Sequence, residues 1–155
     1  MSWVEIFSKD LDLIKDFITV QSSLSDFYKE TMTIPECVRK LENNKQSMRA
    51  FIWRDKDHEI NLVTALRAPT TMQLKVVGIG HTSDMAQALS ILYAQIKLVM
   101  SDYGVKNLYA IYGDDVKPEC FDFYNSIKDG YDLEGFTGTK TNPKPRVFAF
   151  NASLP

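Results

Sequence analysis

Apolar residues recur along this chain with two spacings, which separate predicted helices from predicted strands. A spacing of three or four residues is typical of a helix with one buried face, whereas alternation is typical of a strand. The first spacing predicts helices over residues 9–20, 34–43, 84–103 and 118–128. Short β-branched and aromatic runs predict strands over residues 3–7, 48–54, 59–67, 72–80, 105–112, 131–137 and 146–151. This order indicates an α/β (α+β) domain with a mixed central sheet and helices on both faces.

Capping residues predict where three of these helices begin. Ser8, Thr33 and either Thr82 or Ser83 are the expected N-caps, and Glu36 completes a capping box with Thr33. The first helix is expected to bury one apolar face. That face consists of Leu11, Ile14, Phe17 and Ile18.

The three strands between residues 48 and 80 are joined by short turns, which favour an antiparallel meander. The long helix that follows ends at Gly104, a residue suited to the left-handed position after a helix. A strand, a long helix and another strand predict a right-handed crossover. We therefore expect Leu74–Gly80 and Asn107–Tyr112 to lie side by side and parallel.

Length and composition limit the class of protein. With 155 residues, 45% hydrophobic and 25% charged, the sequence predicts one globular domain over residues 1–155. A net charge of −2 argues against a nucleic-acid partner, because phosphate binding requires clustered Lys and Arg. The most apolar run, residues 88–100, is too short and polar to span a membrane, and no signal peptide is expected. Cys37 and Cys120 cannot form a disulfide framework or a four-cysteine zinc site, so we expect a cytoplasmic protein without a metal.

Two segments, together with the element order, carry a resemblance to a known family. Residues 123–136 contain Phe-Tyr followed later by Gly-Phe, and residues 104–112 form the sequence Gly-Val-Lys-Asn-Leu-Tyr-Ala-Ile-Tyr. Both are similar to motifs of the GNAT superfamily of N-acetyltransferases, and the resemblance covers nearly the whole chain. It implies a GNAT-like fold whose fourth and fifth strands splay apart around a V-shaped cleft. It also implies acetyl-coenzyme A as the cofactor if the chain is active.

The family's coenzyme-binding motif is present in part. Active members carry Gln/Arg-x-x-Gly-x-Gly/Ala before the main helix, where backbone N–H groups hold the coenzyme pyrophosphate. Gly78 and Gly80 match the glycines, but no Gln or Arg precedes them at the family spacing, and Asp84 brings a negative charge to the phosphate position. The alternative for these glycines is a bulge or close packing of a helix on the strand. If coenzyme A binds, the resemblance assigns it to Val77, Gly78, Ile79, Gly80, Thr82 and Ser83.

Few residues match the family's catalytic positions. Tyr124 corresponds to the general acid on the penultimate helix, and its alternative is a core aromatic. The fourth strand lacks the carboxylate that serves as general base, so Asp57 and Glu59 at the preceding turn are the substitutes. His58 in that charged turn is expected to be solvated, and His81 is expected to be a loop histidine beside the helix start.

Thr82-Ser83-Asp84 carries a second resemblance, to degenerate GNAT-like proteins in the virion-structure modules of short-tailed bacteriophages. Two functions therefore stand open. One is a non-catalytic GNAT-like protein that acts by protein contact, including as a virion component in the host cytoplasm or the virion. The other is an acetyl-coenzyme A-dependent N-acetyltransferase with an atypical coenzyme loop. For the first, Phe27 and Tyr28 are the expected contacts with a protein partner or a second copy, and their alternative is ordinary core.

Overall fold

Six strands and three helices make up the part of the chain that the computed structural model describes, residues 3–24, 33–43, 48–113 and 147–153. The strands are β1 (Val4–Ile6), β2 (Met48–Arg54), β3 (His58–Ala68), β4 (Thr71–Thr82), β5 (Asn107–Gly113) and β6 (Val147–Ser153). The helices are α1 (Leu11–Leu24), α3 (Ile34–Asn43) and α4 (Met85–Tyr103). The predicted helix over residues 118–128 and the predicted strand over residues 131–137 lie outside the described residues.

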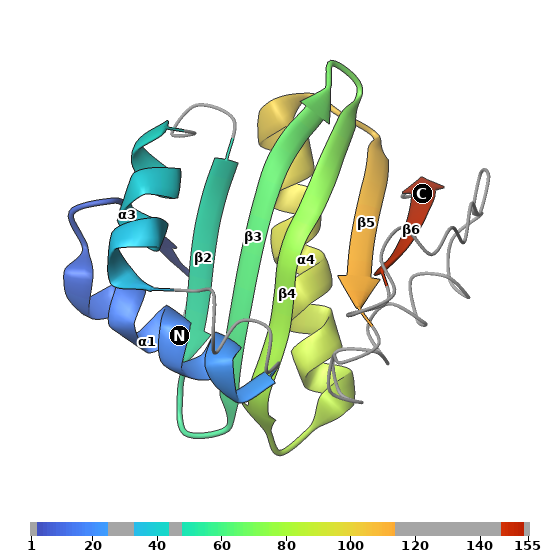
Figure 1. Ribbon diagram of the computed structural model, residues 1–155. Helices are drawn as coiled ribbons and strands as arrows, with labels where there is room; N and C mark the ends of the chain where they lie inside the picture. Colours follow the sequence, from blue (N-terminus) through green and yellow to red (C-terminus); the bar gives the residue numbers. More distant parts are fainter. Residues whose placement is uncertain (1–2, 25–32, 44–47, 114–146, 154–155) are drawn as a thin grey trace.

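The strands form one mixed sheet in the order β1-β2-β3-β4-β5-β6. Neighbouring strands are antiparallel except β4 and β5, which are parallel and joined through α4. Figure 1 shows α1 and α3 on one face of this sheet and α4 on the other. The structure therefore confirms the predicted fold class, the meander of β2, β3 and β4, and the crossover through α4.

Each face of the sheet has its own apolar core. Leu62, Leu74 and Ile79 pack with Leu92 and Ile96 of α4 on one face. The face under α1 and α3 is filled by buried side chains of both helices and of four strands, namely Ile6, Ile14, Phe17, Leu41, Ala50, Ile52, Val63 and Val76. The alternation along the strands thus divides them between two helical layers, as expected for a sheet covered on both sides.

The first helix begins later than its sequence predicts. The N–H of Asp10 bonds to the carbonyl of Phe7, and the Asp10 carboxylate accepts the N–H of Phe7 at 2.8 Å, so a turn precedes α1. Asp10, not Ser8, therefore stands before the first helical residue. Leu11 is 51% exposed rather than buried, so the buried face of α1 begins at Ile14.

The start of α4 is also displaced from its predicted position. The N-cap is Asp84, not Thr82 or Ser83, because β4 stays paired with β3 as far as Thr82. At the other end, Gly104 adopts φ 69° and ψ 29°, which confirms its predicted left-handed role. Only Ser83 and Asp84 therefore connect β4 to α4.

Candidate site where β4 and β5 separate

The parallel pairing of β4 with β5 is short. Thr71–Leu74 pairs with Asn107–Ala110, and within the described residues the pairing ends there. β4 then follows β3 to Thr82, whereas β5 follows β6 to Gly113. Figure 1 shows the far ends of β4 and β5 apart. The predicted parallel, splayed arrangement is confirmed, although the paired part of β4 starts three residues earlier than expected and ends at Leu74.

A β-bulge lies at the point of separation. Thr64 pairs with Leu74 and Val63 pairs with Val76, so Lys75 is an extra residue on β4. Leu74 faces α4, whereas Val76 belongs to the core under α1 and α3. Because a bulge bends its strand and increases the local twist, β4 turns away from β5 at this residue.

The start of α4, where the resemblance places the coenzyme pyrophosphate, carries a carboxylate of the chain itself. Asp84 has extended backbone angles, and its Oδ1 accepts the N–H of Gln87 at 3.2 Å. A helix start attracts anions through its free N–H groups and positive partial charge. Here Asp84 occupies one of those N–H groups and places its own negative charge beside the others.

A buried histidine fixes this junction from the β3 side. His58 is 2% exposed; its Nδ1 lies 2.7 Å from Thr82 Oγ1 and its Nε2 lies 3.0 Å from Gln87 Oε1. The Thr82 hydroxyl also bonds to the backbone of Asp84. The prediction that His58 is solvated was wrong. The sequence pattern did indicate its burial, because His58 continues the alternation of the buried residues Ile60 and Leu62.

The residues that the resemblance assigns to coenzyme A do not form a loop. Val77, Gly78, Ile79 and Gly80 lie inside β4, and Val77 and Ile79 are buried against α4. Thr82 is the last residue of β4, and Ser83 is exposed in the link to α4. Gly78 and Gly80, the glycines that match the coenzyme-binding motif, thus lie in a strand that is paired with β3 along its length.

Gly80 has a structural role that explains the absence of a side chain. It is the extra residue of a second bulge, since Glu59 pairs with His81 and Ile60 with Ile79. A Cβ at Gly80 would lie 2.8 Å from Cγ1 of Val20 in α1. For Gly80, the prediction of a bulge with close helix packing is therefore confirmed.

The remaining candidate residues are distributed away from this junction or lie outside the description. Tyr124, Phe27 and Tyr28 fall outside the described residues. His81 lies in β4 opposite Glu59, not in a loop as predicted. The carbonyl of Asp57 accepts the N–H of Ser83 at 3.0 Å, so the turn before β3 touches the helix start through its backbone.

No three His, Cys, Asp or Glu side chains in the described part of the chain gather closely enough to hold a metal ion. None of the described helices has the length and apolar character needed to cross a membrane.

Several solved structures with a similar fold are described as acetyltransferases. An aminoglycoside 6'-N-acetyltransferase from Enterococcus faecium is 12% identical, with a TM-score of 0.66 over 100% of this chain and 98% of that chain. A probable acetyltransferase from Staphylococcus epidermidis ATCC 12228 is 14% identical, with a TM-score of 0.69 over 99% of each chain. A GNAT family acetyltransferase from Elizabethkingia anophelis, with acetyl-CoA bound, is 11% identical, with a TM-score of 0.53 over 75% of this chain and 82% of that chain. The chain has a GNAT-like fold.

The GNAT-like fold is what these comparisons show, because the sequence identities are too low to carry activity or substrate. No family model matches the sequence, and no curated protein matches it. The function therefore has to be argued from the site, where the GNAT-like splay of β4 and β5 is combined with a carboxylate-capped helix start.

Proposed function

We propose that this chain is a GNAT-fold protein that does not hold the coenzyme A pyrophosphate and acts through contacts with other proteins. The observation that carries the proposal is the Asp84 carboxylate on the N–H of Gln87 at the start of α4. A phosphate at that position would have to displace the carboxylate or remain beside it. Either arrangement opposes binding, since like charges repel and the helix start then offers fewer free N–H groups.

The connection between β4 and α4 supports the same proposal. A pyrophosphate cradle needs several consecutive backbone N–H groups turned toward one point, as in glycine-rich loops. Here β4 pairs with β3 through Thr82, and only Ser83 and Asp84 lie between this pairing and the start of α4 at Met85. The buried His58 contacts both sides of this link, Thr82 and Gln87, so lengthening the link would break these two hydrogen bonds.

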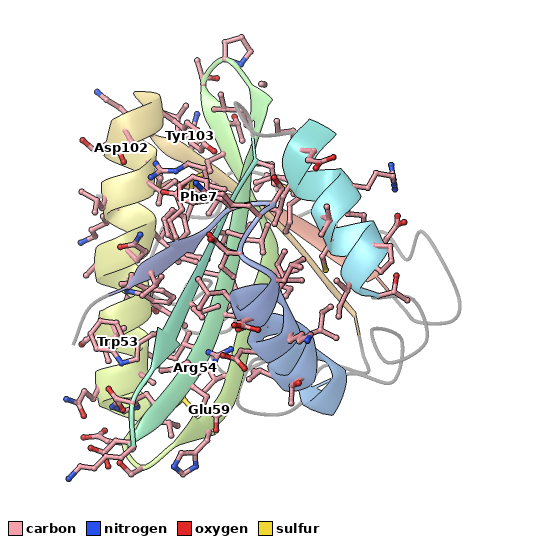
Figure 2. All side chains as sticks on the ribbon, turned by 90° about the vertical axis from the view of Figure 1, so that its left-hand side faces the viewer. Phe7, Trp53, Arg54, Glu59, Asp102 and Tyr103 are labelled. Carbon is pink, nitrogen blue, oxygen red and sulfur yellow. The ribbon has the colours of Figure 1, made fainter. Side chains whose placement is uncertain are left out.

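The β1 side of the molecule supports a role in protein contact. β1 is an edge strand of three residues, and Figure 2 views the molecule from this side, with Phe7 labelled. Val4, Phe7 and Leu11 are 45%, 54% and 51% exposed. Exposed apolar side chains at a sheet edge suit a protein partner or a second copy. The virion-like Thr82-Ser83-Asp84 segment favours a structural assembly as the setting.

A thermal melting experiment with coenzyme A tests the proposal. We expect no stabilisation at millimolar coenzyme A, whereas a specific ligand at about 100 times its Kd adds about 2.7 kcal/mol. An active GNAT-fold acetyltransferase serves as the positive control. The Asp84→Ser variant keeps a good N-cap and removes the charge, so any gain of coenzyme binding in it locates the cause at Asp84. Stabilisation of the wild-type protein by coenzyme A would contradict the proposal.

One observation favours a second candidate, an acetyl-coenzyme A-dependent N-acetyltransferase with an atypical coenzyme loop. The pairing of β4 with β5 ends at Leu74 within the described residues, and the bulge at Lys75 bends β4 away from β5, as the resemblance implies for a member that binds the coenzyme between these strands. The two candidates differ in acetyl transfer to small amines or peptides. If transfer is detected and Tyr124→Phe lowers its turnover about tenfold or more, Tyr124 acts as a general acid and the non-catalytic proposal is wrong.

A further inference from the structure

A cavity lies between the sheet and the helices α1 and α3, away from the start of α4. Its volume is about 240 Å³, and it opens to solvent on one side. Most of its wall is apolar and comes from both helices and from β2, β3 and β4. This wall includes Ile14, Phe17, Leu41, Met48, Val63 and Val76.

Within the described part of the chain, the charged residues of the cavity lining are Lys40 of α3 and Lys75 of β4, and both are exposed. They therefore stand where the cavity meets solvent, with apolar residues behind them. Among the residues that the structure describes, no Asp or Glu contributes to this lining. On α3, Glu36 lies outside the lining and forms an ion pair with Arg39; the hydrogen bond from Arg39 and, to a smaller extent, the charge of Lys40 lower the pKa of this carboxyl.

The bulge in β4 is what brings Lys75 to this face. In a regular strand, adjacent side chains alternate between faces. Here both Lys75 and Val76 line the cavity under the helices, while Leu74 and Val77 face α4. The extra residue thus adds a cation to a face that would otherwise carry only Val76 at this position.

We propose that this cavity binds a small amphipathic carboxylate, with the apolar part between α1, α3 and the sheet and the carboxylate at Lys40 and Lys75. An apolar body is favoured because the deep wall offers hydrocarbon, and an anion is favoured because the described residues of the lining include two lysines and no Asp or Glu. This inference does not depend on the proposed function, because it uses neither the helix start nor the splayed strands.

The volume limits the size of the ligand. An engineered apolar cavity of about 150 Å³ accepts benzene, and pockets for drug-sized molecules begin at about 300 Å³. A cavity of about 240 Å³ lies between the two. It therefore suits a medium-chain alkyl carboxylate or a small aryl carboxylate, and octanoate is the probe that we choose.

Isothermal titration of the full chain with octanoate, octan-1-ol and octylammonium tests both halves of the proposal. We expect octanoate to bind best, octan-1-ol at least about tenfold more weakly, and octylammonium without measurable affinity. Butanoate should bind more weakly than octanoate, because each buried methylene is worth roughly fourfold in affinity.

Matched variants locate the binding. Lys75→Met and Lys40→Met keep a long apolar stem and should each weaken octanoate about tenfold. Lys97→Met removes the same charge from the exposed side of α4 and should leave the affinity unchanged. Ala50→Leu adds side-chain volume inside the cavity and should abolish binding while preserving the melting temperature.

Cys37 provides a second readout, because it lines the cavity and is half-buried. In a Cys120→Ser background, octanoate should slow the reaction of Cys37 with a small disulfide reagent at least about fivefold. The proposal is overturned if octanoate leaves this rate unchanged, or if octan-1-ol or octylammonium binds as well as octanoate. It is also overturned if Lys97→Met weakens octanoate as much as Lys75→Met does.

Discussion

Asp55 organises the turn between β2 and β3 with a single carboxylate. Its Oδ2 accepts the indole N–H of Trp53 at 2.6 Å, and its Oδ1 accepts the N–H groups of Asp57 and His58 at 2.7 and 2.8 Å. The hydrogen bond from Trp53 is the main reason that the pKa of Asp55 lies below its ordinary value. These bonds also set the position of His58, which then reaches Thr82 and Gln87.

The lowered pKa of Asp55 predicts a pH dependence of stability. A carboxyl whose pKa is lower in the folded chain stabilises the fold above its unfolded pKa of about 3.9, and this contribution is lost as pH falls through the folded value. Asp55→Asn should therefore lower the melting temperature at neutral pH, with a difference from wild type that shrinks below about pH 4. Asp57→Asn, in the same turn, is the control. A difference that stays constant or grows toward low pH would contradict this role.

Single residues also show what the sequence could not decide. The charge of Asp84 at the helix start was visible, but its capping role was not, because Thr82 and Ser83 are equally good caps by residue type. The cap was decided by the length of β4, which remains paired with β3 through Thr82. Tertiary pairing therefore displaced a local preference by one or two residues.

Among the elements, the contact of α1 with β4 depends on one missing side chain. Val20 is buried near the end of α1, and its Cγ1 occupies the space in which Gly80 would carry a Cβ. Gly80 is also the point at which β4 gains an extra residue relative to β3. The glycine spacing that resembles a coenzyme motif is thus used here, at Gly80, for packing between two elements.

This contact predicts a coupled pair of substitutions. Gly80→Ala should destabilise the protein by about 1–3 kcal/mol, because a Cβ 2.8 Å from Val20 Cγ1 overpacks the contact. Adding Val20→Ala should remove part of that cost, so that the double variant is more stable than the sum of the single variants by about 1 kcal/mol. Urea denaturation measures each free energy of unfolding.

Gly104→Ala is the matched control for this cycle. It is also destabilising, but the cause is its φ of 69°, and nothing lies within 4 Å of a Cβ there. Its cost should therefore add to that of Val20→Ala without coupling. Coupling of Val20 with Gly104 as large as with Gly80 would mean that the effect does not arise from packing.

The order and type of the described elements were predictable, because their buried faces follow simple alternation and helical spacing. The register was not. The pairing of β3 with β4 shifts at three places; glycine indicated the shift at Gly80, but nothing indicated the one at Lys75, which determines where β4 leaves β5 and which face receives this lysine. A bulge moves one residue between the faces of a sheet without changing composition or local propensity, so it left no signal in the apolar pattern.

At the scale of the whole molecule, one arginine links the sheet edge to the opposite helical layer. Arg49 of β2 bonds to Glu5 of β1 at 2.7 Å and to Asp102 near the end of α4 at 2.9 Å. Its bond to Glu5 is the main reason that its pKa is raised. Figure 2 shows Asp102, Tyr103 and Phe7 near the same end of the molecule, at the top of the view. These bonds fix the β1 edge in the free protein, which lowers the entropic cost of ordering it when a partner binds there.

The contact predicted at Phe27 and Tyr28 concerns the assembly of whole molecules, and the simplest such assembly is a dimer of this chain. A central aromatic contact is worth about 2 kcal/mol or more, which is roughly thirtyfold in the dissociation constant. Sedimentation equilibrium of the full chain should show self-association that Phe27→Ala weakens by this factor, with a melting temperature close to wild type.

Phe7→Ala, at a phenylalanine already known to be 54% exposed, provides the comparison for that experiment. Phe7 buries little surface, so truncating it removes few contacts. The melting temperature of the Phe7→Ala variant therefore shows what to expect when a surface aromatic is removed from this fold. If Phe27→Ala instead costs about 3–5 kcal/mol of stability, the range for a core phenylalanine, then Phe27 is core and the predicted contact is wrong. If Phe7→Ala weakens association and Phe27→Ala does not, the interface lies at the β1 edge instead. A wild-type chain that remains monomeric at all concentrations would contradict self-association altogether.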